Sequence, residues 1–137
     1  MNKIKYDSDS IKLITLFESM TGAKVKDCIS NEKLIFIMEE NEMGRAIGRN
    51  GVNVKRIENK LRRKVKLVEF SNDVLQFVKN LIYPGEVSDI KQENDKLVIH
   101  AKDTHTRAML IGRERQNINH LSGIVRRHFN AKEIKVV

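Results

Sequence analysis

The sequence predicts an α+β fold in which one order of elements, α-β-β-α-α-β, occurs twice. The segment Ile-Gly-Arg-Asn-Gly at 47–51 recurs 64 residues later as Ile-Gly-Arg-Glu-Arg at 111–115. An ungapped alignment of 47–63 on 111–127 gives six identities. These are Ile47/Ile111, Gly48/Gly112, Arg49/Arg113, Asn53/Asn117, Arg62/Arg126 and Arg63/Arg127. Helical and strand patterns also follow one another in the same order in both halves, which indicates a duplicated domain.

The first half begins with polar residues at 7–10, whose oxygens can cap a helix that Thr21 and Gly22 end. One apolar face of this helix is predicted from Ile11, Ile14, Leu16, Phe17 and Met20. Strands are expected at 23–29 and 33–38 around a turn at 30–32. A short helix at 40–47, the glycine loop, a helix at 52–63 and a strand at 65–70 complete the half.

The second half repeats this order from residue 71, where Ser-Asn-Asp can cap a new helix. Apolar residues define the buried side of that helix: Val74, Leu75, Phe77, Val78, Leu81 and Ile82. Tyr83, Pro84 and Gly85 end it. Strands are expected at 86–92 and 96–101, a helix at 104–111, a helix at 116–128 and a strand at 132–137.

Size and composition favour two small units that support each other. The chain has 137 residues, of which 40% are hydrophobic, and it contains one proline. A unit of about 60 residues buries only about 60% of its unfolded surface, so we expect the two halves to stabilise each other by packing. We place the domains at 1–70 and 71–137, with almost no linker between them.

The charge balance favours an anionic partner. The formal net charge is +8, and both halves are basic. Nine cations fall within 45–66, around the intact glycine loop, and we expect them to mark one face. They are Arg45, Arg49, Lys55, Arg56, Lys60, Arg62, Arg63, Lys64 and Lys66.

The glycine loop itself has the chemistry of a phosphate site. Without a Cβ, Gly48 and Gly51 let a sugar-phosphate backbone lie directly against the main chain. The first-turn N–H groups of the helix at 52–63 would point at the phosphates. Arg49 can reach a phosphate oxygen, and Asn50 can donate to it without repulsion. Ile47 and Val54 would offer apolar contact to bases.

These residues resemble the KH domain, whose signature is an I-G-x-x-G loop between two helices that clamps about four single-stranded nucleotides. The element order is similar to the type II form, and two such units resemble the archaeal NusA-like transcription termination factors. The resemblance implies two tandem type II KH domains, each with a three-stranded mixed sheet covered by helices. It also implies binding of single-stranded RNA, the nascent transcript, together with RNA polymerase, in transcription termination or elongation control.

The predicted RNA-binding residues of the first unit are Arg45, Ile47, Gly48, Arg49, Asn50, Gly51, Lys55 and Arg56. Those of the second unit are Gly112, Arg113 and Arg115. The loop at 112–115 departs from the signature, because Arg115 replaces the last glycine and Glu114 brings negative charge. We expect both its geometry and its electrostatics to be poorer. Two alternatives stay open for the loop at 112–115: it contacts RNA, or it is a purely structural copy of the first loop.

Other chemistry is not supported by the sequence. The four histidines have no metal-ligand spacing, and Cys28 lies in a predicted strand, where we expect it to be buried. Neither a P-loop nor a dinucleotide-binding motif occurs. We therefore expect no enzyme activity, no cofactor, no metal and no small-molecule substrate. The N-terminus lacks the apolar run of a signal peptide, so we expect a cytoplasmic protein without membrane contact.

Three other binding classes compete with single-stranded RNA as the interpretation of this pattern. A helix-turn-helix reader of duplex DNA normally packs its helices on other helices, while here strands flank them. An aromatic stacking platform is disfavoured because only 5% of residues are aromatic. The main alternative is a scaffold or assembly factor for ribosome or RNA polymerase, whose basic face would bind rRNA or acidic protein.

Overall fold

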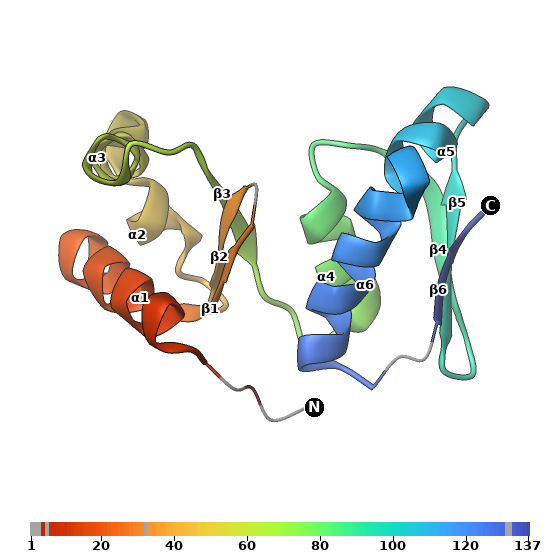
Figure 1. The fold of residues 1–137 in the computed structure, drawn as a ribbon, viewed down its shortest axis with the longest axis horizontal. Helices are drawn as coiled ribbons and strands as arrows, with labels where there is room; N and C mark the ends of the chain where they lie inside the picture. The colour runs from red at the N-terminus through yellow and green to blue at the C-terminus, as the bar shows by residue number, and fades with distance from the viewer. Residues whose placement is uncertain (1–3, 5, 32, 131–132) are drawn as a thin grey trace. The chain divides into compact units, whose positions relative to one another are not determined.

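The computed structural model describes residues 4, 6–31, 33–130 and 133–137. The chain forms two compact units, and the boundary between them falls between Ser71 and Asn72. Each unit has the order α-β-β-α-α-β, with a short 3-10 turn between its last two helices (Figure 1). None of the helices within the described ranges has the length and apolar character that a membrane crossing requires.

The first unit consists of α1 (Ser8–Thr21), β1 (Val25–Ser30), β2 (Leu34–Met38), α2 (Met43–Ile47), the turn η1 (Arg49–Gly51), α3 (Val52–Leu61) and β3 (Val65–Glu69). Strand β2 is central, antiparallel to β1 and parallel to β3. The three helices lie on one side of this sheet (Figure 1). The predicted α+β architecture with a mixed three-stranded sheet is thus confirmed. Of the predicted turn at 30–32, Glu32 lies outside the described residues.

Helix α1 begins and ends as the sequence predicts. The Asp7 carboxylate accepts a hydrogen bond from the N–H of Ser10 at 2.7 Å, and Gly22 ends the helix with φ of 72°. The predicted apolar face was wrong at Ile11, whose side chain is 51% exposed. Ser10 is buried in its place, because it stands two helical turns before the buried Phe17 and so shares its face.

The core of the first unit forms where alternate residues of β2 meet the helices. Leu34, Phe36 and Met38 are fully buried, together with Phe17 and Ile57 from α1 and α3. The rings of Phe17 and Phe36 lie 4.4 Å apart between centroids. The prediction that Phe36 belongs to the core is confirmed, and this packing holds both helices on the sheet.

Helix α3 ends at Leu61, two residues earlier than the sequence predicted. Arg62 adopts a left-handed conformation with φ of 55°, and its N–H donates to the Glu58 carbonyl. The Glu58 carboxylate accepts a hydrogen bond from the N–H of Val65 at 3.0 Å. Glu58 therefore fixes both the end of the helix and the entry into β3.

The second unit consists of α4 (Val74–Ile82), β4 (Val87–Glu93), β5 (Lys96–Ala101), α5 (Thr104–Ile111), the turn η2 (Arg113–Arg115), α6 (Gln116–His128) and β6 (Glu133–Val136). Its sheet has the order β4-β5-β6 with the same mixed directions. Helix α6 has the predicted bounds, while Lys132 of the predicted last strand lies outside the described residues. Phe77, predicted as core, is fully buried.

Helices α4 and α5 each follow an aspartate that caps them. Asp73 accepts a hydrogen bond from the N–H of Leu75 at 3.0 Å, and Asp103 accepts one from the N–H of Thr106 at 2.7 Å. The hydrogen bond from Thr106 lowers the pKa of Asp103. These caps satisfy N–H groups that a helix cannot pair internally, which fixes where α4 and α5 start.

We predict that the thiol of Cys28 does not react in the native protein. Cys28 is 2% exposed, as the sequence suggested, and burial, followed by the charge of Asp27, raises the pKa of the thiol to about 12. Since the thiolate is the nucleophile, a disulfide reagent at pH 8 should label Cys28 only after unfolding in guanidinium. Rapid labelling without denaturant would contradict this.

Candidate nucleic-acid interface

The loop between α2 and α3 reverses the chain within four residues. Gly48 has φ of 76° and ψ of 169°, a region that residues with side chains rarely enter. Asn50 and Gly51 are left-handed, with φ of 57° and 74°. The N–H of Gly51 donates to the Gly48 carbonyl at 3.1 Å, which closes the turn.

The two glycines are required for different reasons. A Cβ at Gly48 would lie 2.8 Å from Cγ of Asn53 and 3.0 Å from its backbone nitrogen, so this position has no room for a side chain. A Cβ at Gly51 would meet nothing within 4 Å, so only its left-handed backbone calls for glycine. Open space therefore lies beside Gly51, where a ligand can approach the bare main chain.

The side chain of Asn53 holds the two ends of this loop together, a role that was not predicted from the sequence. Its Nδ2 donates a hydrogen bond of 2.7 Å to the Arg45 carbonyl, which ties the first turn of α3 to α2. Asn117 makes the same bond, 2.7 Å long, to the Met109 carbonyl in the second unit. The identity of Asn53 and Asn117 in the internal repeat was the available signal.

The turn also changes which amides can meet a ligand. We expected the first-turn N–H groups of α3 to be free, but the N–H of Val52 donates to the Arg49 carbonyl within the 3-10 turn. We find no such bond for the N–H groups of Arg49 and Asn50 within the described part of the chain. The N–H groups of these two successive residues are therefore available to donate hydrogen bonds to an anion.

The side chains around the loop combine charge with apolar surface. Arg45, Arg49 and Asn50 are exposed. Ile47 and Val52 are 39% and 47% exposed, which is unusual for large apolar residues. Val54, which we had expected to contact bases, is only partly exposed, and Val52, which the sequence analysis missed, lies beside the loop in its place.

The nine clustered cations do not share one role. Lys55 and Arg56 are exposed on α3, as a binding surface requires. Arg63 instead donates to Ser30 Oγ at 3.0 Å and to the Asn31 carbonyl at 2.9 Å, so it holds the turn between β1 and β2. Lys66 lies in β3, where burial and then the charge of Lys33 lower its pKa. The basic segment is thus divided among the loop, the helix and the sheet.

The second loop keeps the shape of the first, contrary to expectation. Gly112 has φ of 75° and ψ of 170°, and Glu114 is left-handed with φ of 53°. Arg115 adopts φ of 62° where the first loop has Gly51. A left-handed arginine is strained by about 1 kcal/mol. The hydrogen bond from the N–H of Arg115 to the Gly112 carbonyl and the bond from Asn117 to the Met109 carbonyl nevertheless hold this backbone shape. Arg113, Glu114 and Arg115 are all exposed. The backbone shape is thus kept, while the charge pattern changes and the Arg115 side chain takes the place of the bare main chain at Gly51.

Titratable residues elsewhere form no comparable site. Within the described ranges, no three His, Cys, Asp or Glu side chains lie close enough together to hold a metal ion. His128 is buried and packs edge-on against Phe77, with ring centroids 5.6 Å apart. The glycine loops are therefore the strongest candidates for function.

Comparison with known proteins connects this geometry to one family. A model of the KH domain matches residues 13–81. A protein of Methanococcus vannielii named probable transcription termination protein NusA is 40% identical over 98% of this chain and 80% of its own length. The protein of the same name from Halobacterium salinarum is 32% identical, covering 97% of this chain and 98% of the relative. The crystal structure of APE1850 superposes with a TM-score of 0.73 at 27% identity and covers 96% of this chain.

We predict opposite effects of alanine at two neighbouring glycines. Gly48→Ala should lower the free energy of unfolding by about 2 kcal/mol or more, since the new Cβ clashes and φ is positive. Gly44→Ala is the matched control, because Gly44 lies within α2 with nothing within 4 Å of its Cβ position. It should stabilise the protein by up to about 1 kcal/mol. Equal midpoints in a urea titration would contradict the requirement for glycine at 48.

Proposed function

Because the chain belongs to the NusA-like family of KH-domain proteins, we propose that it binds single-stranded RNA through the loop at Gly48–Gly51. The observation that carries the proposal is the bare, open backbone of this loop, in which the N–H groups of Arg49 and Asn50 have no hydrogen-bond acceptor among the residues that the structure describes. A KH loop of this shape clamps about four nucleotides by their backbone.

The loop supplies three kinds of contact to such a strand. Its amides bind phosphate oxygens, and the Arg49 guanidinium adds charge-assisted hydrogen bonds. Arg45, Lys55 and Arg56 attract the backbone from neighbouring exposed positions. Exposed Ile47 contacts the bases by apolar surface instead of aromatic stacking.

We further propose that the second unit is a second KH domain and that its loop also contacts RNA. The support is its preserved backbone shape, which places Gly112, Arg113 and Arg115 where Gly48, Arg49 and Gly51 stand in the first loop. Arg113 and Arg115 then offset the charge of Glu114. Binding here is weaker than at the first loop, because a carboxylate lies close to the phosphate path.

The names of the relatives support a proposal for the biological setting. Two of them, 40% and 32% identical, are named probable transcription termination proteins. We propose that the RNA is the nascent transcript and that the protein acts together with RNA polymerase in termination or elongation control. The sequence-level alternative, a scaffold of ribosome or polymerase assembly, predicts that the basic residues meet protein instead of RNA.

The first test places negative charge in the intact loop. Arg49→Asp combined with Asn50→Asp should weaken binding of a single-stranded RNA oligomer at least ten-fold, since both side chains are exposed beside the phosphate path. The melting temperature should hardly change, because Asp tolerates the left-handed backbone at 50. Fluorescence anisotropy across a salt series measures both affinity and the number of phosphate contacts.

The matched control is Lys91→Asp with Asn94→Asp. It makes the same change of charge at exposed positions, and Asn94 is also left-handed, with φ of 58°. This variant should keep most of the affinity. Equal losses of affinity in both variants would mean that the loop acts only through its net charge. Weak RNA binding of the unaltered protein at every salt concentration would favour the scaffold function.

The second test removes the negative charge from the second loop. Glu114→Asn makes its third residue identical to Asn50, and Asn readily adopts the left-handed conformation there. We expect RNA affinity to rise several-fold and the salt dependence to steepen. Glu93→Asn removes one exposed carboxylate from β4 and is the control. If both variants gain equally, the second loop lies outside the RNA path.

A further inference from the structure

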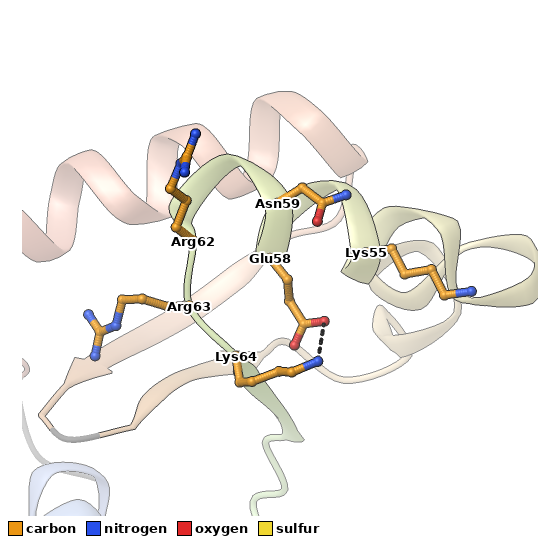
Figure 2. Close-up of a pocket in the computed structure, with 6 residues that line it drawn as sticks. All are labelled: Lys55, Glu58, Asn59, Arg62, Arg63 and Lys64. Atoms are coloured by element: carbon orange, nitrogen blue, oxygen red, sulfur yellow. Dashed lines mark ion pairs between the residues drawn. The ribbon is translucent and has the colours of Figure 1, made fainter.

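A basic hollow extends along α3 from Lys55 to the segment that follows the helix. It has a volume of about 430 Å³ and is lined by Lys55, Glu58, Asn59, Arg62, Arg63 and Lys64. Figure 2 shows Lys55 and Asn59 along the helix, with Arg62, Arg63 and Lys64 on the segment that leaves it. The lining residues thus include four cations and one carboxylate, and only Lys64 points toward that carboxylate (Figure 2).

The single carboxylate is already used by the fold. One oxygen of Glu58 accepts the hydrogen bond from Val65, and the other lies 4.0 Å from Lys64 Nζ. Lys64 remains 95% exposed, so this ion pair is weak and screened. Most of the positive charge of the hollow therefore stays uncompensated by the protein.

Arg62 is the residue that the fold explains least. It occupies the left-handed position after a helix, where glycine or asparagine is preferred and arginine is strained. Its exposed side chain has no hydrogen bond or ion pair with any residue that the structure describes. Arg63, directly beside it, is held by Ser30 and Asn31. An arginine kept at a position that favours glycine, without a partner in the fold, indicates a partner outside it.

The internal repeat retains only part of the lining of the hollow. Arg62 and Arg63 have identical counterparts in Arg126 and Arg127. Where the first unit has Lys55, Glu58 and Asn59, however, the aligned positions of the second unit carry Asn119, Ser122 and Gly123. Helix α6 continues through the position of Arg62 and ends at His128. The same element order therefore forms without Lys55, Glu58 and Asn59, the lining residues that lie within α3, so the fold itself does not require them.

Attraction to the helix dipole accounts for only part of the cluster. Cations near the last carbonyls stabilise a helix, and Lys60 already stands in the last turn of α3. Lys55 lies two turns before Arg62, too far from the last carbonyls to act on them. Lys55, Asn59 and Arg62 instead share one face of the helix by their spacing of four and three residues.

We propose that this hollow binds backbone phosphate of the RNA strand beyond the nucleotides held by the loop. The inference rests on the proposed function of the first loop. Arg62 and Lys64 follow the end of α3, whose 10 residues at a rise of about 1.5 Å each place them about 15 Å from the glycine loop. The loop clamps about four nucleotides, so a longer strand is needed to reach the hollow. Protein partners favour apolar, aromatic contact surfaces, whereas this lining is entirely charged or polar.

The experiment compares two RNA lengths on the full chain. Arg62→Gly with Lys64→Gln removes two cations, and glycine relieves the left-handed strain, so the variant should be at least as stable as the unaltered protein. Affinity for an oligomer of about twelve nucleotides should fall about ten-fold, and its salt slope by about 1.4, the value for two single-strand phosphate contacts. Affinity for an oligomer of about four nucleotides should stay unchanged.

Lys12→Gln with Lys24→Gln is the matched control, because both lysines are exposed and lie outside the hollow. It should leave the difference between the two RNA lengths intact. Equal losses on both lengths, or no loss on the longer one, would overturn the proposal. Displacement of RNA from the hollow by polyglutamate at equal charge concentration would also overturn it, in favour of acidic protein. If the unaltered protein fails to bind the short RNA, the proposed function itself fails.

Discussion

The rest of the interface depends on the close approach of the Asn53 side chain to the backbone at Gly48. The asparagine occupies the space that a Cβ would need, and its bond to the Arg45 carbonyl joins two helices across the turn. Once α2 and α3 are fixed this closely, the chain between them has to pass through left-handed conformations. The turn then uses the amides of Gly51 and Val52 internally and presents those of Arg49 and Asn50.

The second unit separates what this constraint requires from what a ligand requires. It keeps Gly112 and Asn117, and with them the backbone angles, although an arginine has to adopt the position of Gly51. The residue at 114 is a carboxylate, which changes the charge without changing the shape. The backbone geometry of this loop is therefore determined by contacts inside the protein. The charge of its side chains can vary independently, according to the ligand.

The sequence was most informative where a physical rule acts locally. Alternating and helical apolar patterns located the strands and helices, because burial of one face dominates their stability. The early end of α3 was not predictable, since it depends on Glu58 reaching forward to Val65 and on a left-handed Arg62. The exposure of Val52 and the bond of Asn53 were also missed, because both depend on how two helices meet. An identity within the repeat pointed to Asn53, but only the structure supplies the reason.

A loop and a hollow on one helix change how a flexible strand is held. Each phosphate contact is weak in water and salt, since it replaces counterions and competes with solvent. When one end of the strand is clamped by the loop, its next phosphates stay near the other end of α3 at high effective concentration. The second contact then adds affinity without base recognition, so it favours strand length over sequence. Under the proposed function, such a division would suit RNAs of differing sequence, because the proposed contact at the hollow reads no base.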